Sequence, residues 1–168
     1  MKNRPPLPPV VCIVGRSNSG KTTLIEKLLP EFSRLSLAVG TIKHDIHGFD
    51  VDIPGKDSWR HRQAGARITV ISSPTKLALI RDTDHDLGLD ELVVFFKGLD
   101  LILTEGYKRE RNPKVEIHRA EVHAEPLCQG DDNLIAFVCD TPLDLGVPRF
   151  GLGDTAGLAA FLKDYFRV

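Results

Sequence analysis

The chain has 168 residues, of which 42% are hydrophobic and 27% charged, with a formal net charge of −1. This length suits one domain with a sizeable core, and the charge balance excludes a protein that coats nucleic acid through a strongly basic surface. No stretch approaches the roughly 20 apolar residues of a membrane-spanning helix. The three cysteines, Cys12, Cys128 and Cys139, are odd in number and show no C-x-x-C spacing, which predicts reduced structural thiols in a cytoplasmic protein; the apolar runs around Cys12 and Cys139 predict that these two are buried.

The N-terminus differs in composition from the rest of the chain. Prolines stand at positions 5, 6, 8 and 9, and each lacks a donor N–H and favours an extended backbone. We therefore expect residues 1–9 to form a flexible Pro-rich tail. Residues 10–168 are expected to form a single domain.

Hydrophobic spacing divides the domain into alternating strands and helices. Strands are predicted at 10–14, 37–43, 68–73, 76–81, 101–103, 114–118 and 134–139. Helices are predicted after the first strand with an end near Pro30, at 57–66 with Asp57 as its cap, from Leu89 to near Gly98, and after a cap at Asp154 or Thr155. This order indicates an α/β fold with a largely parallel sheet flanked by helices, interrupted by a β-hairpin at 68–81.

A phosphate-binding loop follows the first strand. Residues 15–22, Gly-Arg-Ser-Asn-Ser-Gly-Lys-Thr, match the pattern G-x-x-x-x-G-K-[ST]. Glycines let successive N–H groups point at phosphate oxygens, the following helix adds its positive end, and the lysine adds a full charge. The residues expected to bind the nucleotide here are Gly15, Arg16, Ser17, Asn18, Ser19, Gly20, Lys21, Thr22 and Thr23.

A magnesium site is expected beside this loop. The hydroxyl of Thr22 is one candidate ligand, and Glu105, just after the buried strand 101–103, is the candidate carboxylate. Aspartate is the more familiar residue at such a strand end. Gly106 next to it permits close approach of the phosphates, whereas Asp100 starts the same strand and is expected at the opposite edge.

Further candidates follow two other strands. Lys43 is a candidate to neutralise phosphate. Asp45 is a candidate either to bind magnesium through a water molecule or to orient water, and it is a catalytic candidate together with Lys21. His44, His47 and His61 are either zinc ligands or exposed loop residues. Asp140 follows an apolar strand, where a carboxylate can accept two N–H bonds from guanine. The complete N-K-x-D signature of GTPases is missing, so the residues leave guanine and adenine open.

Several blocks in order resemble a known family. They are the phosphate loop, Thr-Ile-Lys-His-Asp at 41–45, His-Gly-Phe-Asp-Val-Asp at 47–52, Pro-Gly-Lys-Asp-Ser at 54–58, Gly-Ala at 65–66 and Thr-Glu-Gly-Tyr-Lys at 104–108. Together they resemble the MobB family of molybdopterin-guanine dinucleotide biosynthesis adapter proteins, over residues 10–166. The phosphate loop is shared by many families, whereas the other blocks are more specific.

The resemblance implies a P-loop NTPase-like fold, GTP and Mg²⁺ as ligands, a homodimer and a weak GTPase activity. It implies as partners a MobA-like guanylyltransferase, which joins GMP to molybdopterin, and molybdopterin or its guanine dinucleotide. By motif, Lys21 and Thr22 serve the phosphates and Mg²⁺, and Glu105 takes the Walker-B position.

Two other functions remain as alternatives at this point. A P-loop small-molecule kinase would use Lys108, Arg109, Arg111 and Lys114 as a basic lid over the transferring phosphate, although such a run is also typical of a solvated loop. A metal-insertion GTPase would use the three histidines. Basic residues at 60, 62 and 67 are either a solvated helix face or a site for a pterin phosphate or an acidic partner surface.

Overall fold

The computed structural model describes residues 7–168, which divide into two compact units. The chain up to His44 and Val93–Val168 belong to the first unit, and Asp45–Leu92 form the second. The expectation of one domain over residues 10–168 stays a prediction. Within the described residues, no helix is both long and apolar enough to cross a membrane.

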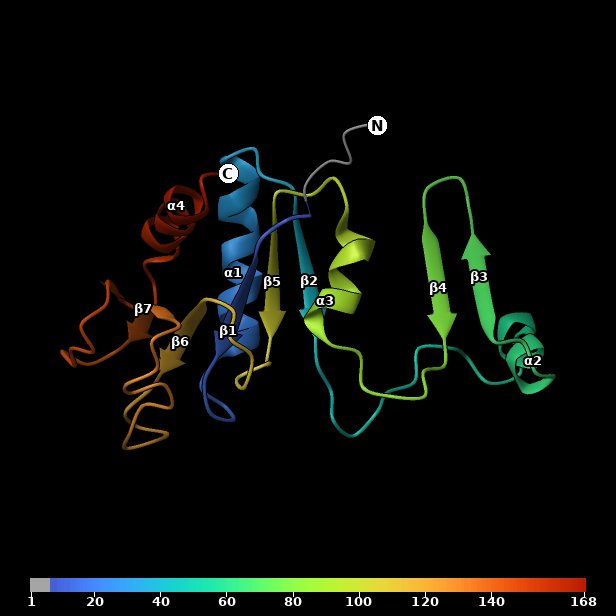
Figure 1. The fold of residues 1–168 in the computed structure, drawn as a ribbon, viewed down its shortest axis with the longest axis horizontal. Coiled ribbons are helices and arrows are strands. Elements are labelled where there is room, and N and C mark those ends of the chain that lie inside the picture. The colour runs from blue at the N-terminus through green and yellow to red at the C-terminus, as the bar shows by residue number, and fades with distance from the viewer. Residues whose placement is uncertain (1–6) are drawn as a thin grey trace. The chain divides into compact units, whose positions relative to one another are not determined.

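A six-stranded sheet forms the centre of the first unit (Figure 1). Its strands are β1 (Val10–Val14), β2 (Val39–Lys43), β5 (Leu101–Glu105), β6 (Lys114–His118), β7 (Leu134–Cys139) and β8 (Arg149–Phe150). The order is β2-β5-β1-β6-β7-β8, and every neighbouring pair is parallel. The predicted α/β class is confirmed. The two-residue strand β8 was not predicted, because it is too short to show a period.

Two long helices, α1 (Lys21–Arg34) and α4 (Thr155–Phe166), contact each other. The predicted end of α1 near Pro30 is wrong, because the helix runs one further turn and Phe32 in that turn is fully buried. A proline removes one helical hydrogen bond, and burial of the aromatic ring offsets that cost. Asp154 is the N-cap of α4, and its Oδ1 accepts from the Gly157 N–H at 3.1 Å.

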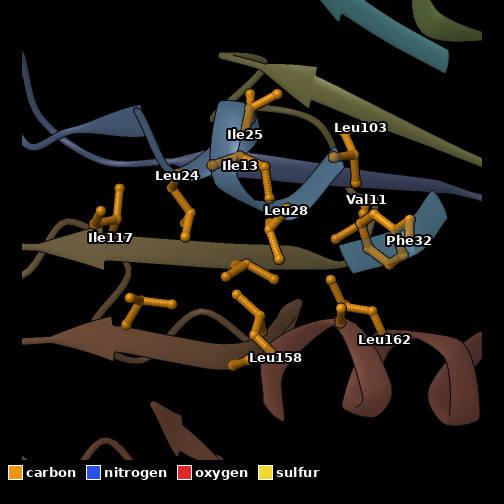
Figure 2. Close-up of a cluster of buried hydrophobic side chains, with 14 of the residues drawn as sticks. Val11, Ile13, Leu24, Ile25, Leu28, Phe32, Leu103, Ile117, Leu158 and Leu162 are labelled. Atoms are coloured by element: carbon orange, nitrogen blue, oxygen red, sulfur yellow. The ribbon is translucent and has the colours of Figure 1, made fainter. Parts of the chain in front are cut away.

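The hydrophobic core lies between the sheet and these two helices, and Figure 2 shows its centre. Alternate residues of the strands, among them Val11, Ile13 and Leu103, point to the same face because the side-chain period of a strand is two. They pack with Leu28 of α1 and Leu158 of α4, both almost completely buried. Because all neighbouring strands are parallel, their carboxyl ends lie at the same edge of the sheet.

The described end of the predicted tail is packed onto the sheet. Pro8 is buried, and the carbonyl oxygen of Pro9 accepts a hydrogen bond from the Ile102 N–H at 2.9 Å. Residues 1–6 of the predicted tail lie outside the described residues. All three cysteines are free and buried, which confirms the predicted burial of Cys12 and Cys139.

The second unit contains α2 (Asp57–Gln63), β3 (Ile68–Ser72), β4 (Leu77–Arg81) and α3 (Leu89–Leu92). β3 and β4 pair antiparallel, which confirms the predicted hairpin. Lys56, not Asp57, is the N-cap residue of α2. The single helix predicted from Leu89 is wrong: α3 ends after one turn, and a 3₁₀ segment, Val93–Phe96, follows it.

Candidate nucleotide-binding site

The phosphate loop connects β1 to α1 and requires glycine at both of its glycine positions. Gly15 has φ +151° and Gly20 has φ +98°, in the region that disfavours other residues. A Cβ at Gly15 would stand 2.5 Å from the carbonyl oxygen of Ile117. Gly20 is the N-cap residue of α1 and no side chain caps the helix, so the first N–H groups of α1 face the loop.

Lys21 lies across this loop. Its ammonium donates to the carbonyl oxygens of Gly15 at 3.1 Å and Arg16 at 2.9 Å. Burial lowers the pKa of Lys21; the Glu105 carboxylate partly opposes that shift, and the charge of Lys108 adds to it. The charges of Glu105 and Lys108 therefore act on Lys21 next to the loop, where the two lysines favour an anion.

Thr22 and Glu105 meet at the start of α1. The Thr22 hydroxyl donates to Oε1 of Glu105 at 2.8 Å. Glu105 ends β5, the strand adjacent to β1, and pairs in register with Lys43 at the end of β2. A hydroxyl and a carboxylate are the hard oxygen ligands that Mg²⁺ prefers, alongside phosphate oxygens and water. These two residues therefore fit the expected magnesium site.

The other loop residues divide by exposure. Arg16, Ser17 and Asn18 are exposed at the crest, where Asn18 has φ +63°. Ser19 is 1% exposed, and its hydroxyl has no hydrogen-bond partner within the described part of the chain. Thr23 is exposed on the first turn of α1.

Asp140 is at the same edge of the sheet, after β7. It is exposed, and its Oδ1 accepts from the Ala120 N–H at 3.2 Å. It borders a cavity of about 360 Å³ between the ends of β7 and β8. The other residues around this cavity are Cys139, Thr141, Pro142, Arg149, Phe150 and Gly151. A second polar site therefore lies at the edge that carries the phosphate loop.

Asp45 is the first residue of the second unit. There its Oδ1 accepts from the His47 N–H at 3.0 Å, within a turn closed by the Gly48 N–H. In the first unit, the His44 ring stacks on Tyr107 with centroids 4.7 Å apart. Between residues 7 and 168, no group of three or more His, Cys, Asp or Glu is placed to hold a metal ion.

Lys114 differs from its expected place in a basic lid. It is only 3% exposed in β6, and its ammonium lies 2.6 Å from Oδ2 of Asp131. Lys108, Arg109 and Arg111 remain exposed after β5. Lys114 is therefore a buried structural cation. Its expected place in a basic lid is wrong, because β6 begins at Lys114, within the run of basic residues.

Sequence reasoning missed two residues next to the phosphate loop. Nε2 of His123 lies 2.9 Å from the carbonyl oxygen of Ser17, and the Arg119 guanidinium lies beside Gly20. Both belong to the connection after β6. Only Arg119 has a signal in the sequence: it directly follows a buried strand. Glu105 and Asp140 were chosen as candidates because they have similar positions at the ends of two other strands.

The second unit has a larger cavity of its own, about 750 Å³. Arg62, Arg67 and Arg81 line it together with acidic residues. Arg62 is neutralised by Asp82, at 2.9 Å, and by Asp52, at 3.9 Å. Within the described second unit, Arg67 and Arg81 form no salt bridge, although the charge of Arg81 helps to lower the pKa values of Asp84 and Glu91. The wall of this cavity therefore carries cationic groups beside its acidic ones.

The model of a known family, described as molybdopterin guanine dinucleotide synthesis protein B (MobB), matches residues 10–140. The chain belongs to the MobB family. It is 36% identical to the molybdopterin-guanine dinucleotide biosynthesis adapter protein of Escherichia coli over 164 residues, which cover 95% of this chain and 94% of that protein. The adapter protein of Haemophilus influenzae is 35% identical over 94% of this chain and 89% of its own length.

MobB structures share the fold. The crystal structure of Bacillus subtilis MobB matches with a TM-score of 0.72 and 33% identity, over 92% of this chain and 96% of that one. The resemblance seen in the sequence is therefore confirmed, as is the P-loop NTPase-like class of this MobB-family chain.

Proposed function

We propose that this MobB-family protein binds magnesium GTP and acts as an adapter in molybdenum cofactor biosynthesis. In this proposal it assists, in the cytoplasm, a MobA-like enzyme that attaches GMP to molybdopterin to form molybdopterin guanine dinucleotide. The observation that carries the nucleotide part is the arrangement of Lys21, Thr22 and Glu105 around a loop that only glycine at Gly15 and Gly20 allows.

Each group of this loop has a distinct part in binding. The backbone N–H groups of the loop and of the start of α1 donate to phosphate oxygens, and the Lys21 ammonium neutralises their charge. Thr22 and Glu105 would hold Mg²⁺, which would supply positive charge to offset that of the phosphates. Lys43, in register with Glu105, is placed to add a further positive charge at this edge.

Guanine recognition is assigned to Asp140. Its Oδ1 already accepts from Ala120, and a carboxylate oxygen can accept more than one N–H. The adjacent cavity of about 360 Å³ falls within the size range of small-molecule sites. A purine base seated there would present its N–H groups to the carboxylate.

An adapter fits the site better than a kinase. The buried pairing of Lys114 with Asp131 removes one of the four cations that a basic lid would need. Asp45 stays the proposed water-orienting residue, because it comes two positions after Lys43, the last residue of β2. We expect hydrolysis to be slow and binding to be the main activity.

The hairpin of the second unit supports a homodimer. In the described second unit, only Thr69 and Leu89 are buried. Apolar side chains are exposed on both strands: Ile68, Val70, Ile71, Leu77 and Leu79 are between 46% and 68% exposed. A two-stranded hairpin with apolar faces is marginal alone. A second copy of the chain presents the same apolar surface, so pairing two hairpins buries both.

The cavity of the second unit supports molybdopterin as a ligand. Arg67 and Arg81 lie on its wall, and a guanidinium binds phosphate oxygens in a bidentate way. A pterin phosphate therefore matches the charge of this cavity, and its volume of about 750 Å³ leaves room for the ring system.

Calorimetry with magnesium GTP tests the nucleotide part, with Lys21→Ala as the variant. We expect the wild-type protein to bind and Lys21→Ala to lose binding while it keeps its far-ultraviolet circular dichroism. Equal affinity of the two proteins would refute the assignment. Capture of a purified MobA-like enzyme on the immobilised protein, with and without GTP, tests the adapter part, and no capture in either condition would refute it.

A further inference from the structure

The connection between β6 and β7, residues 119–133, contacts the phosphate loop at two points. Nε2 of His123 lies 2.9 Å from the carbonyl oxygen of Ser17 at the loop crest. Because a carbonyl oxygen can only accept, Nε2 must carry the proton. At the other point, Nε and Nη2 of Arg119 each lie 3.7 Å from where a Cβ on Gly20 would stand.

This connection is held firmly by the strands on either side. Glu116 in β6 is 1% exposed, and its two carboxylate oxygens accept from the N–H groups of Leu127 at 2.5 Å and Cys128 at 2.8 Å. Asp140, at the end of β7, accepts from the N–H of Ala120. Arg119 and His123 are therefore held in place before any ligand binds.

The guanidinium of Arg119 has two neighbouring nitrogens, Nε and Nη2, that form no salt bridge within the described chain. Its Nη1 lies 3.6 Å from a carboxylate oxygen of Glu121, whose side chain is 71% exposed. Its Nε is buried and has no hydrogen-bond partner among the residues that the structure describes. The Nε–Nη2 edge is the one that grips two oxygens of a phosphate at once, and this edge faces the N-cap residue of α1.

The charges around Gly20 favour an anion. The positive end of α1 and the Lys21 ammonium are already there. Arg119 adds a third positive group, and its only ion-pair partner within the described chain is the exposed Glu121. A buried donor without a partner costs free energy, and an anionic oxygen near Gly20 would satisfy it.

We propose that Arg119 is a further nucleotide-binding residue, which contacts an anionic phosphate oxygen through its Nε–Nη2 edge. His123 is a positioning residue, which acts through Ser17 by holding the crest of the loop in its binding shape. The proposal rests on the proposed nucleotide function and extends the binding site from the loop to the connection after β6.

Calorimetry with magnesium GTP on the full chain tests Arg119. We expect Arg119→Gln to raise the dissociation constant about ten- to a hundredfold, as for a lost charged hydrogen bond. Arg119→Lys is expected to recover part of this loss, because it keeps the charge without the fork. Arg34→Gln is the matched control, since Arg34 pairs with Glu31 in the last turn of α1, and it should bind like the wild-type protein.

The thermal unfolding midpoint without nucleotide separates binding from structure. The proposal predicts that Arg119→Gln unfolds within about 2 °C of the wild-type protein, since the 3.6 Å ion pair with the exposed Glu121 contributes little stability and the buried Nε has no partner among the described residues to lose. Wild-type affinity in Arg119→Gln would overturn the proposal. A fall in affinity that matches a large fall in the midpoint, with no recovery in Arg119→Lys, would assign Arg119 a structural role and also overturn it.

His123→Gln and His123→Ala test the positioning role. A glutamine amide can donate to the Ser17 carbonyl and alanine cannot, so we expect His123→Ala to bind more weakly and His123→Gln to bind nearly normally. Equal affinities would overturn this role. If wild-type protein and Lys21→Ala both give no heat, the nucleotide function itself has failed; if only Lys21→Ala fails to bind while Arg119→Gln binds normally, only the present inference has failed.

Discussion

The Thr22 hydroxyl donates a 2.8 Å hydrogen bond to Oε1 of Glu105, a residue that is 83 positions away in the sequence. One residue begins α1 and the other ends β5, the neighbour of β1 in the sheet. The parallel pairing of β1 with β5 brings them together, because it places the carboxyl ends of both strands at one edge. The Thr22–Glu105 pair therefore lies directly beside the phosphate loop.

Replacement of the Glu105 carboxylate should remove the magnesium dependence of nucleotide binding. In the wild-type protein, chelation of Mg²⁺ is expected to weaken GTP binding, whereas Glu105→Gln should already bind weakly and respond little to chelation. A reduction in metal affinity of about tenfold or more is typical for loss of such a group. Calorimetry with and without EDTA measures this. Glu110→Gln, an exposed carboxylate close by in sequence, is the control, and a full magnesium response in Glu105→Gln would contradict the prediction.

The phosphate loop should not tolerate a side chain at its first glycine. Gly15→Ala places a methyl group 2.5 Å from the Ile117 carbonyl and 2.6 Å from the Ser19 hydroxyl, at φ +151°. The backbone must shift, at a cost of about 1–3 kcal/mol, and we expect GTP binding to be lost. Gly153→Ala has no atom within 4 Å of the new methyl group and serves as the control. Normal GTP affinity in Gly15→Ala would show that the loop does not need its observed shape.

The Lys114–Asp131 pair should make stability depend on acid pH. The hydrogen bond from Lys114, aided by the Asn133 N–H, lowers the pKa of Asp131 from 3.8 to about 2. Because the folded-state pKa is the lower one, the stabilisation is complete above about pH 4 and is lost as the pH falls through about 2. The Asp131→Asn variant lacks this stabilisation at every pH, because its side chain has no carboxylate. We therefore expect the unfolding free energy of Asp131→Asn to be about 2 kcal/mol lower than that of the wild-type protein near pH 7, as a result of the shifted pKa. This difference should shrink as the pH falls toward 2.

Urea unfolding at a series of pH values measures this dependence. The control is Asp132→Asn, a change at the neighbouring exposed residue, and its stability should depend on pH as that of the wild-type protein does. Loss of Asp131 also leaves the buried Lys114 ammonium without its partner, which adds to the deficit at neutral pH. A deficit that does not change between pH 7 and pH 2 would be evidence against the pair as the source.

The hairpin of the second unit should determine the oligomeric state. Leu79 is 49% exposed and lies opposite Val70 in the β3–β4 pair. Leu79→Glu would bury a charge if two hairpins pack together, and we expect the dimer dissociation constant to rise about tenfold or more. Sedimentation velocity measures it. Leu143→Glu changes an exposed leucine of the first unit and should leave the dimer intact; equal behaviour of the two variants would exclude the hairpin as the interface.

Turnover of GTP by the isolated protein should be slow. The glutamines of the chain, Gln63 and Gln129, follow neither β2 nor β5, so none is at a position that orients water in fast GTPases. We expect a rate below about 0.01 per second, as for P-loop proteins without an activating partner. Release of inorganic phosphate in single turnover measures it. Transfer of the γ-phosphate to a small molecule would instead favour a kinase.

Sequence reasoning found the features that depend on neighbouring residues. The strand, loop and helix from Val10 to Arg34 follow one another, so this local arrangement could be predicted from spacing alone, while its binding of phosphate stays a prediction. The position of Glu105 beside the loop could be predicted because a carboxylate after a buried strand reaches the carboxyl edge of any parallel sheet. The end of α1 was misplaced because Pro30 is a local signal, whereas the burial of Phe32 that overrides it depends on distant residues.

His123 could not be found in this way, because nothing in its local pattern differs from an ordinary loop. Arg119 directly follows a buried strand, as Asp140 does, but this position alone does not show that it lies beside the phosphate loop. The contacts of these two residues with Gly20 and Ser17 exist because β6 lies next to β1, and strand order is decided by which apolar faces pack together. The same reason explains Lys114, which sits in a charged run of the sequence but in the interior of the protein. Short-range periodicity and motif spacing thus identify the chemistry of the phosphate loop, while the groups that surround it are selected by long-range strand pairing, which no local pattern encodes.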